Sequence, residues 1–220
     1  MTIMHAQRAE IVHYGKKLIT ARLTTGTGGN LCILDPLSGL AAISPSGIEY
    51  EDMQPEDVVV VDLDGRIVHG RCTPSSELSA HLALYRQRED IRAVLHTHSV
   101  YASTLACLHW ELPAVHYLVG FAGVKVPLAP YATYGSPELA ANICTAIGGS
   151  NAVLLTNHGL IAVGGDLKSA YVIAEEIELV ARIYYQARCA GDPVILPDEE
   201  MERVIEKFKN YGQKKSGPHG

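Results

Sequence analysis

The sequence has no surplus of basic residues, no long hydrophobic run and no closely paired cysteines, and each absence excludes a class of protein. Its 18 Lys and Arg against 24 Asp and Glu give a net charge of −6. This charge argues against a nucleic acid partner, because phosphate backbones are bound by clustered basic side chains. No segment approaches the roughly 20 apolar residues of a membrane span, and the polar N-terminus does not resemble a signal peptide. We therefore expect a cytoplasmic protein without a membrane partner.

Motifs that mark several other functions are also missing. The five cysteines are widely spaced and form no CxxC pair, so we expect reduced thiols and no disulfide framework. The loop from Thr25 to Asn30 holds a partial GxGxxG, but Leu31 stands at the last glycine position and a hairpin pattern follows, which disfavours a dinucleotide-binding fold. The sequence also lacks GK[ST], so it contains no P-loop.

Helical and strand patterns alternate along the 220 residues, whose 47% hydrophobic content is enough for one sizeable core. The patterns predict helices over residues 6–23, 74–88, 100–108, 137–147, 167–191 and 198–208, and strands over 31–34, 40–43, 58–62, 67–68, 93–98, 115–117, 126–128, 153–156 and 160–163. Hairpins among helices predict an α/β protein with an antiparallel or mixed sheet covered on its faces. We expect a single domain over residues 1–212 and a disordered tail over 213–220.

The strongest chemical signal is His96-Thr97-His98, which closes the apolar run Ala93–Leu95. Alternate residues of a strand point to the same side, about 6.6 Å apart, so both histidines can bind one ion. A single HxH is more often an exposed strand or a buried structural histidine. However, His158 also follows an apolar strand-like run and can supply a third nitrogen. Three histidines around an open fourth position are typical of catalytic zinc, whereas structural zinc usually has four protein ligands.

Three loops of small residues, 25–30, 44–47 and 73–76, offer hydroxyl and backbone N–H groups. We expect the third at a helix N-terminus, with Thr73 as the cap and Pro74 as the first helical residue, where an anion is favoured. Each loop alone is more often an ordinary turn or cap. Three of them in one small acidic protein favour a phosphate site, and Glu77 would place a carboxylate between that phosphate and the metal.

Six motifs occur in one order along the chain: Asn30, Ser46-Gly47, Ser75-Ser76-Glu77, His96-Thr97-His98, Pro130–Gly135 and Asn157–Leu160. In this order and spacing, over about residues 8–212, the sequence resembles the class II aldolase/adducin-like family. Within that family it is most similar to the L-fuculose-phosphate aldolase branch. The segment Glu206–Gly212 completes the pattern.

The resemblance implies a three-layer α/β/α fold with a mainly antiparallel central sheet, and a homotetramer with active sites at subunit interfaces. It implies one zinc ion per subunit, with another divalent metal as the alternative. The implied metal ligands are His96, His98 and His158, with Glu77 as a resting fourth ligand that becomes the acid/base. The other implied site residues are Tyr117 of a neighbouring subunit as proton donor, Asn30, Ser46, Gly47, Ser75 and Ser76 around the phosphate, and Tyr134, Phe208 and Tyr211 around the aldehyde.

The activity that the resemblance implies is reversible cleavage of a ketose 1-phosphate to glycerone phosphate and an aldehyde. The substrate expected is L-fuculose 1-phosphate or a 5-deoxypentulose 1-phosphate. Two other enzymatic branches stay open: a sugar-phosphate 4-epimerase, which typically has aspartate at the position of Glu77, and an oxo-tetronate phosphate decarboxylase. A non-catalytic adducin-like oligomerisation module would lack the metal ligands. Structural roles also stay open for Glu77 as a helix stabiliser, for Tyr117 as a core aromatic and for His81, four residues beyond Glu77.

Overall fold

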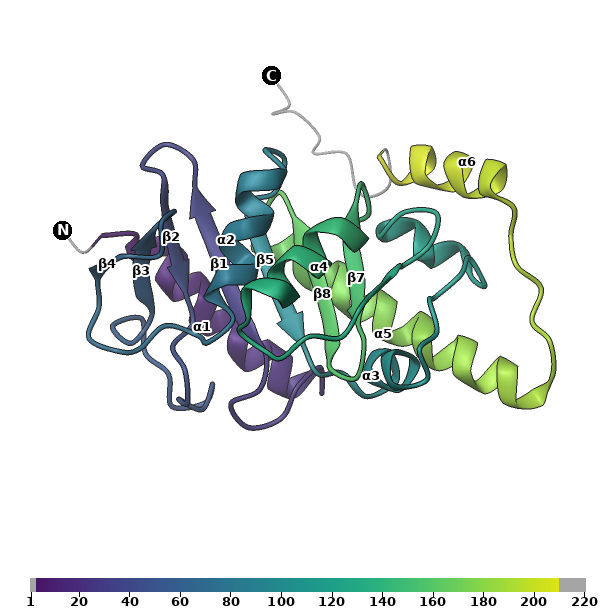
Figure 1. The fold of residues 1–220 in the computed structure, drawn as a ribbon, viewed down its shortest axis with the longest axis horizontal. Helices are drawn as coiled ribbons and strands as arrows, with labels where there is room; N and C mark the ends of the chain where they lie inside the picture. The colour runs from purple at the N-terminus through teal and green to yellow at the C-terminus, as the bar shows by residue number, and fades with distance from the viewer. Residues whose placement is uncertain (1–2, 210–220) are drawn as a thin grey trace, which may run out of the picture.

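Eight strands form one sheet at the centre of the structure, a computed structural model that describes residues 3–209 (Figure 1). The strands lie in the order β4-β3-β2-β1-β5-β8-β7-β6, and each neighbouring pair is antiparallel except β6 and β7. The prediction of a mainly antiparallel sheet is therefore confirmed. The end of the predicted domain at residue 212 and the predicted tail 213–220 lie outside the described residues.

Helices alternate with the strands along the chain. In chain order the elements are α1 (His5–Thr20), β1 (Asn30–Asp35), β2 (Leu40–Ile43), β3 (Val59–Asp62), β4 (Ile67–His69), α2 (Leu78–Gln87), β5 (Ala93–Thr97), α3 (Val100–Cys107), the 3₁₀ helix η1 (Tyr117–Phe121), β6 (Leu128–Ala129), α4 (Pro137–Ile147), β7 (Ala152–Leu155), β8 (Gly159–Gly164), α5 (Leu167–Ala190) and α6 (Asp198–Phe208).

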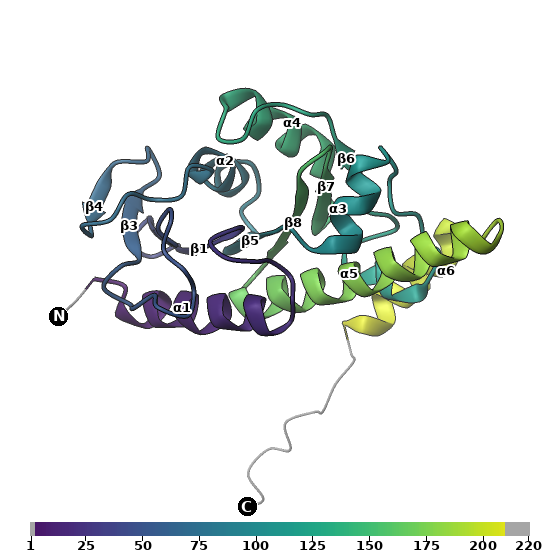
Figure 2. The same cartoon turned by 90° about the horizontal axis from the view of Figure 1, so that it is seen from below.

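Side chains alternate between the two faces of each strand and build one hydrophobic core on each face. On β1, Leu31 and Ile33 join a core with α1, α3 and α5, whereas Cys32 and Leu34 join a core with α2 and α4. Seen from below, α1 and α5 lie along one side of the sheet and α2 and α4 along the other (Figure 2). The predicted three-layer α/β/α arrangement is confirmed.

Strand β5 lies in the middle of the sheet, between β1 and β8, and brings distant segments together. Asn30 of β1 pairs with His96 of β5, and Thr97 pairs with Leu160 of β8. Because side chains alternate, His96 points to the same face as Val94, which packs in the core with α2 and α4. The end of a fully buried central strand thus presents its histidine toward the start of α2.

Helix α2 begins at Leu78, so the prediction of a helix from Pro74 with Thr73 as its cap is wrong. Residues 73–75 are instead held extended against residues 44–46, with a bridge between Pro45 and Pro74. Two backbone hydrogen bonds secure this pairing, from the Ser46 N–H to the Thr73 carbonyl at 2.9 Å and from the Ser75 N–H to the Ser44 carbonyl at 3.1 Å. Because these long-range bonds hold residues 73–75 extended, α2 begins only after Glu77.

The predicted strand over residues 115–117 is also wrong, because this segment leads into η1. The side chain of His116 accepts a hydrogen bond from the Leu118 N–H, and the Val119 N–H donates to the His116 carbonyl at 3.0 Å. These bonds start a helical turn where the sequence pattern alternates like a strand. The predicted strand 126–128 is shifted, since β6 begins only at Leu128.

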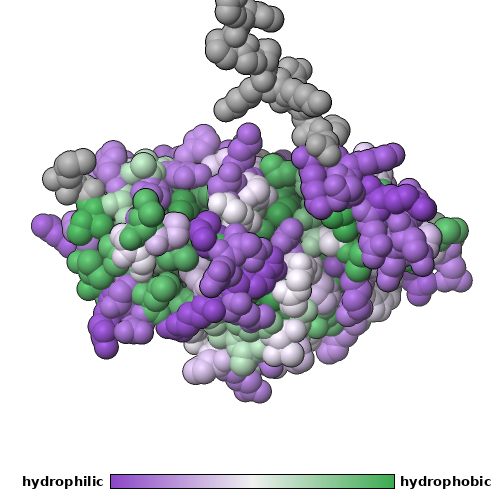
Figure 3. Space-filling view, turned by 90° about the horizontal axis from the view of Figure 1, so that it is seen from above, coloured by the Kyte–Doolittle hydropathy of each residue, from purple (hydrophilic) through white to green (hydrophobic). Residues whose placement is uncertain are grey.

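The C-terminal helix α6 packs one side against η1 and keeps its charged side in water. Met201, Val204, Ile205 and Phe208 are buried or partly buried, whereas most residues between them are exposed and charged. The charged side forms the hydrophilic area at the right of the view from above (Figure 3). Over residues 3–209, no helix is both long and apolar enough to span a membrane.

Candidate active site

Three histidines converge at the end of β5. His96 and His98 come from β5 and the residue after it, and His158 comes from the turn between β7 and β8. The Nε2 atom of His96 lies 3.0 Å from Nε2 of His98 and 3.2 Å from Nε2 of His158. Asn157 adopts the left-handed conformation, φ 54°, which turns the chain sharply and aims His158 back at the strand end.

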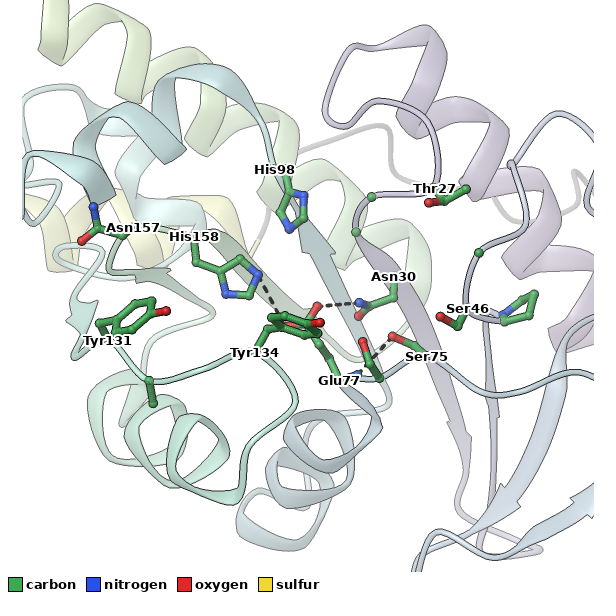
Figure 4. A pocket seen from close by; sticks show the side chains of 16 residues that line it. Thr27, Asn30, Ser46, Ser75, Glu77, His98, Tyr131, Tyr134, Asn157 and His158 are labelled. Carbon is green, nitrogen blue, oxygen red and sulfur yellow. Dashed lines mark hydrogen bonds and ion pairs between the residues drawn. The ribbon is translucent and has the colours of Figure 1, made fainter.

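The carboxylate of Glu77 completes this group. Its Oε2 lies 3.1 Å from His96 Nε2, and its Oε1 lies 3.5 Å from His158 Nε2. Glu77 stands at the N-cap position of α2 and is only 8% exposed. Figure 4 shows Glu77, His98 and His158 pointing into one space, with Ser46 and Thr27 on the opposite side.

The donor set fits a divalent metal ion. Ligand atoms of His96, His98 and His158 all lie within 4.8 Å of one another. Two nitrogens at about 2.05 Å from a tetrahedral ion are separated by about 3.3 Å, close to the distances between these rings. The Nδ1–H of His96 donates to the Leu160 carbonyl at 3.0 Å, which leaves the lone pair on Nε2 facing the other donors.

The protonation equilibria of two of the three histidines agree with metal binding. Burial, reinforced by the nearby His96, lowers the pKa of His98 and of His158 to about 4, so both rings are neutral ligands near pH 7. Burial opposes ionisation of Glu77, but His96 and His158 outweigh it and hold the pKa of this carboxyl well below its ordinary value. Conversely, burial opposes protonation of His96, yet the Glu77 carboxylate raises the pKa of this ring.

Two glycines give the backbone room beside the rings. A Cβ at Gly159 would lie 2.2 Å from the Thr97 carbonyl oxygen and 3.1 Å from a carbon of the His98 ring. A Cβ at Gly28 would lie 3.0 Å from Nδ1 of His98. Side chains at these positions would therefore displace the histidines, which ties both glycines to the site.

The ligand group, as we call His96, His98, His158 and Glu77, lies at one end of a cavity of about 440 Å³. Small polar residues form the other end. Ser46, Gly47, Ser75 and Ser76 all line this cavity, as the sequence predicts for a phosphate site. Within residues 3–209, the backbone N–H groups of Gly47 and Ser76 donate to no protein group. Free N–H groups and hydroxyls suit an anion.

Asn30 also lines the cavity, but its side chain is turned toward Glu77. Its Nδ2 donates to Glu77 Oε2 at 2.9 Å, and its Oδ1 is hydrogen-bonded to Nε2 of His81. The amide nitrogen keeps a second N–H that no group among residues 3–209 accepts. Asn30 therefore joins the predicted acid/base to the predicted phosphate end.

The predicted aromatic residues fall into two places. Tyr134 lines the cavity and is 67% exposed. Tyr117 is 48% exposed and does not line the cavity of its own chain. Its ring lies near that of Phe208, with centroids 6.2 Å apart. Phe208 in turn stacks on Phe121. Tyr211 lies outside the described residues.

Several residues that line the cavity are not among the predicted site residues: Thr27, Gly28, Gly29, Pro45, Tyr131, Ala132 and Asn157. Most of them lie inside motifs that the sequence already marks, such as the loop 25–30 and the segment Pro130–Gly135. Tyr131, which is 60% exposed, also lies in the segment Pro130–Gly135, but nothing within that segment marks it as a cavity residue.

Comparisons with known proteins agree with this geometry. Residues 9–185 match the family described as Class II Aldolase and Adducin N-terminal domain. A 5-deoxy-D-ribulose 1-phosphate aldolase of Bacillus thuringiensis serovar kurstaki is 53% identical over 211 residues, which cover 96% of this chain and 99% of that protein. An L-fuculose phosphate aldolase of Escherichia coli strain K12 is 40% identical over 192 residues, covering 86% of this chain and 88% of that protein.

Solved structures give the same result. A structure described as L-fuculose 1-phosphate aldolase superposes with a TM-score of 0.90 at 50% sequence identity, and the match covers 92% of this chain and 95% of that chain. A putative aldolase/epimerase/decarboxylase, YgbL of Escherichia coli, superposes with a TM-score of 0.82 at 28% identity over 93% of this chain and all of that one.

Proposed function

The chain belongs to the class II aldolase and adducin family, and from this membership we propose that it is a metal-dependent aldolase, an aldehyde-lyase. Its proposed reaction is the reversible cleavage of a ketose 1-phosphate to glycerone phosphate and an aldehyde. The observation that carries the proposal is one cavity with His98, His158 and Glu77 at one end, next to buried His96, and at the other end hydroxyls and N–H groups that no group among residues 3–209 accepts. A non-catalytic member of the family has no need of that donor set.

A divalent ion at this site would supply Lewis acid chemistry, polarising the substrate carbonyl and stabilising the negative charge that develops when the C3–C4 bond breaks. His96, His98 and His158 would hold this ion. Zinc is the proposed metal, because three neutral imidazoles with an open position suit it, and another divalent ion is the alternative.

The side chains around the ion have separate tasks in the proposal. Ser46, Gly47, Ser75 and Ser76 bind the phosphate and so fix the position of the adjacent carbon atoms. Glu77 carries a proton to or from the hydroxymethyl carbon of the glycerone phosphate fragment. No lysine is required, because the charge left by bond cleavage is stabilised without a Schiff base.

Tyr117 is proposed to act from a neighbouring subunit, at the oxygen that becomes the aldehyde. Within one chain it lies outside the cavity and is half-exposed, which suits a residue that serves the site of another copy. The proposal therefore includes a homotetramer with sites at subunit interfaces. It also includes Phe208 and Tyr211 as aldehyde contacts, and a cytoplasmic location, where phosphorylated sugars that do not cross membranes unaided are produced.

A 5-deoxypentulose 1-phosphate is the first substrate to test, because a relative named for 5-deoxy-D-ribulose 1-phosphate shares 53% of its residues with this chain. L-fuculose 1-phosphate is the second. The aldehyde released from L-fuculose 1-phosphate is larger by one CHOH unit, and an added group of about that size changes binding in a pocket by only about 1–3 kcal/mol, so we expect both to be cleaved.

The test is a metal analysis followed by a coupled assay for glycerone phosphate. We expect about one divalent ion per subunit and higher kcat/KM on 5-deoxyribulose 1-phosphate and L-fuculose 1-phosphate than on L-ribulose 5-phosphate. An epimerase would convert L-ribulose 5-phosphate while releasing little free fragment, and a decarboxylase would act on an oxo-tetronate phosphate. A purified protein with neither metal nor turnover would contradict the proposal.

A further inference from the structure

Three side chains form a buried hydrogen-bonded chain that leads away from the cavity, from Glu77 through Asn30 to His81. Asn30 donates its Nδ2–H to Glu77 Oε2, and Asn30 Oδ1 is hydrogen-bonded to Nε2 of His81. His81 is fully buried on α2, one turn beyond Glu77. The two ends of the Asn30 amide are thus held by the N-cap residue of α2 and by a residue of its first turn.

The chemistry of the groups fixes the direction of each bond. An ionised carboxylate can only accept, so the NH₂ end of Asn30 must face Glu77. The carbonyl end of Asn30 then faces His81, and His81 must carry its proton on Nε2. Nδ1 of His81 has no hydrogen-bond partner among residues 3–209. A protonated ring would bury an N–H without an acceptor, so the neutral Nε2–H tautomer is the form that fits.

The surroundings agree with a neutral ring. Burial lowers the pKa of His81 to about 3, although the nearby Glu77 carboxylate acts in the opposite direction. Near neutral pH such a ring is uncharged, and its single proton on Nε2 remains available as a donor.

We propose that His81 is a positioning residue that acts through Asn30: its Nε2–H holds the Asn30 amide in the one orientation that aims Glu77 at the three histidines. This inference rests on the proposed function. Without the donor, the buried carbonyl of Asn30 has no partner and the amide can turn over. Its oxygen would then face the Glu77 carboxylate, and the two would repel each other.

Asn30 is placed where this orientation matters. It is the residue of β1 that pairs with His96, and it lines the cavity beside Glu77. With its second N–H free, a correctly oriented Asn30 can hold Glu77 and face the substrate at the same time. An inverted Asn30 amide would neither hold Glu77 nor present an N–H to the substrate. The position of Glu77 therefore depends on His81, although His81 does not contact the substrate.

Two variants of equal size separate this role from simple packing. His81→Gln retains an N–H close to the position of Nε2, whereas His81→Met has nearly the same shape and no donor. We expect His81→Met to lower kcat, and the exchange of the glycerone phosphate hydroxymethyl proton with deuterated solvent, by about 10- to 100-fold, the usual effect of losing a partner that orients a metal-site residue. We expect His81→Gln to restore both rates to within about threefold of wild type. Metal content should change little in either variant.

The outcomes are distinct. Equal rates in the two variants, or rate losses that follow only their loss of thermal stability, would overturn the inference and leave the aldolase proposal intact. A wild-type enzyme that binds metal but cleaves no ketose phosphate would overturn the aldolase proposal and this inference together.

A measurement on the unaltered zinc-loaded enzyme covers the case in which His81→Met does not fold. Nitrogen NMR of the imidazoles at pH 7 should show His81 neutral, with a slowly exchanging proton on Nε2. A proton on Nδ1 would overturn the inference, because His81 could not then donate to Asn30.

Discussion

The two ends of the cavity are built in opposite ways. The ligand end is formed by residues on or beside central strands, and His96 and Glu77 are almost fully buried there. The other end, which we call the outer end, holds the predicted phosphate residues and Tyr134. It is formed by loops, where Ser46, Ser76 and Tyr134 are exposed. Buried groups on rigid strands keep fixed distances, whereas exposed loop residues can change without disturbing the sheet. In the proposed function, the bond-breaking chemistry therefore falls to residues at or beside the ends of central strands, and the choice of substrate to exposed loops.

The difference can be tested by substitution, and the ligand end should show the largest effects. His158→Ala should abolish metal binding at stoichiometric concentration, because a site of three protein ligands holds its ion poorly with two. Turnover should fall by more than about 10⁴-fold, beyond what one acid–base group contributes. Metal analysis and the coupled assay measure both, with exposed His13 changed to alanine as the control. Full metal occupancy in His158→Ala would contradict the ligand assignment.

Glu77→Gln should have the next largest effect. Glutamine keeps the shape but cannot take a proton, so kcat should fall by about 10²–10⁴-fold while the three histidines retain the metal. The exchange of the glycerone phosphate proton with deuterated solvent should be lost with it. If Glu77 only stabilised the start of α2, the cost would be about 0.3–1 kcal/mol in unfolding free energy and turnover would stay normal.

The control for Glu77 is Glu111→Gln, which removes an exposed carboxylate paired with Lys125. It should leave both rates unchanged, because exposed ion pairs contribute about 0–1 kcal/mol to stability and this one lies outside the cavity. Exchange at the wild-type rate in Glu77→Gln would show that another group is the base.

The sequence predicts the ligand end better than the outer end. The alternation of side chains along a strand is a local property, so His96 and His98 can be placed on one side of β5 from their spacing alone. That both faces of the sheet are covered also follows from local patterns, because β1 is a continuous apolar run whose side chains enter both cores, and apolar residues recur on one side of α5. His158 meets the other two histidines only because β5 pairs with β8. The order of the motifs implies this pairing, but it cannot be predicted from either segment alone.

What the sequence does not predict depends on long-range pairing. Residues 73–75 look like a helix start, yet the bridge between Pro45 and Pro74 keeps them extended and places Ser75 and Ser76 before the helix. Likewise, His81 has the spacing of an ordinary buried helix residue. Only the fold shows that its ring meets Asn30, which comes from a strand 51 positions earlier in the chain.

Substitutions at the phosphate end should change binding more than chemistry. Replacing both Ser75 and Ser76 by alanine should raise KM for phosphorylated substrates by at least about 10-fold, since even one lost hydrogen bond to a charged group is worth about 1.5–3 kcal/mol. Metal content should not change. The control is Ser38→Ala in the exposed turn between β1 and β2, which should leave KM unaltered. An unchanged KM in the double variant would place the phosphate elsewhere.

The smallest effect is expected at Tyr134, on the exposed wall of the cavity. Tyr134→Phe removes one hydroxyl and keeps the ring, and a neutral hydrogen bond contributes about 0.5–1.5 kcal/mol. We expect kcat/KM to fall by about 2- to 12-fold on L-fuculose 1-phosphate, whose aldehyde fragment carries a hydroxyl, and to remain unchanged on 5-deoxyribulose 1-phosphate, whose fragment has none. The ratio of kcat/KM values for 5-deoxyribulose 1-phosphate and L-fuculose 1-phosphate therefore measures the contact directly.

Tyr131→Phe is the matched control, because Tyr131 lines the same wall and is similarly exposed. A change in the ratio for Tyr134 alone would assign substrate choice to that hydroxyl. Equal changes in this ratio in Tyr131→Phe and Tyr134→Phe would show that substrate choice depends on the polarity of the cavity wall and not on the Tyr134 hydroxyl. A fall in kcat for Tyr134→Phe as large as that of Glu77→Gln would break the division between the two ends, because an exposed loop residue would then take part in the bond-breaking step.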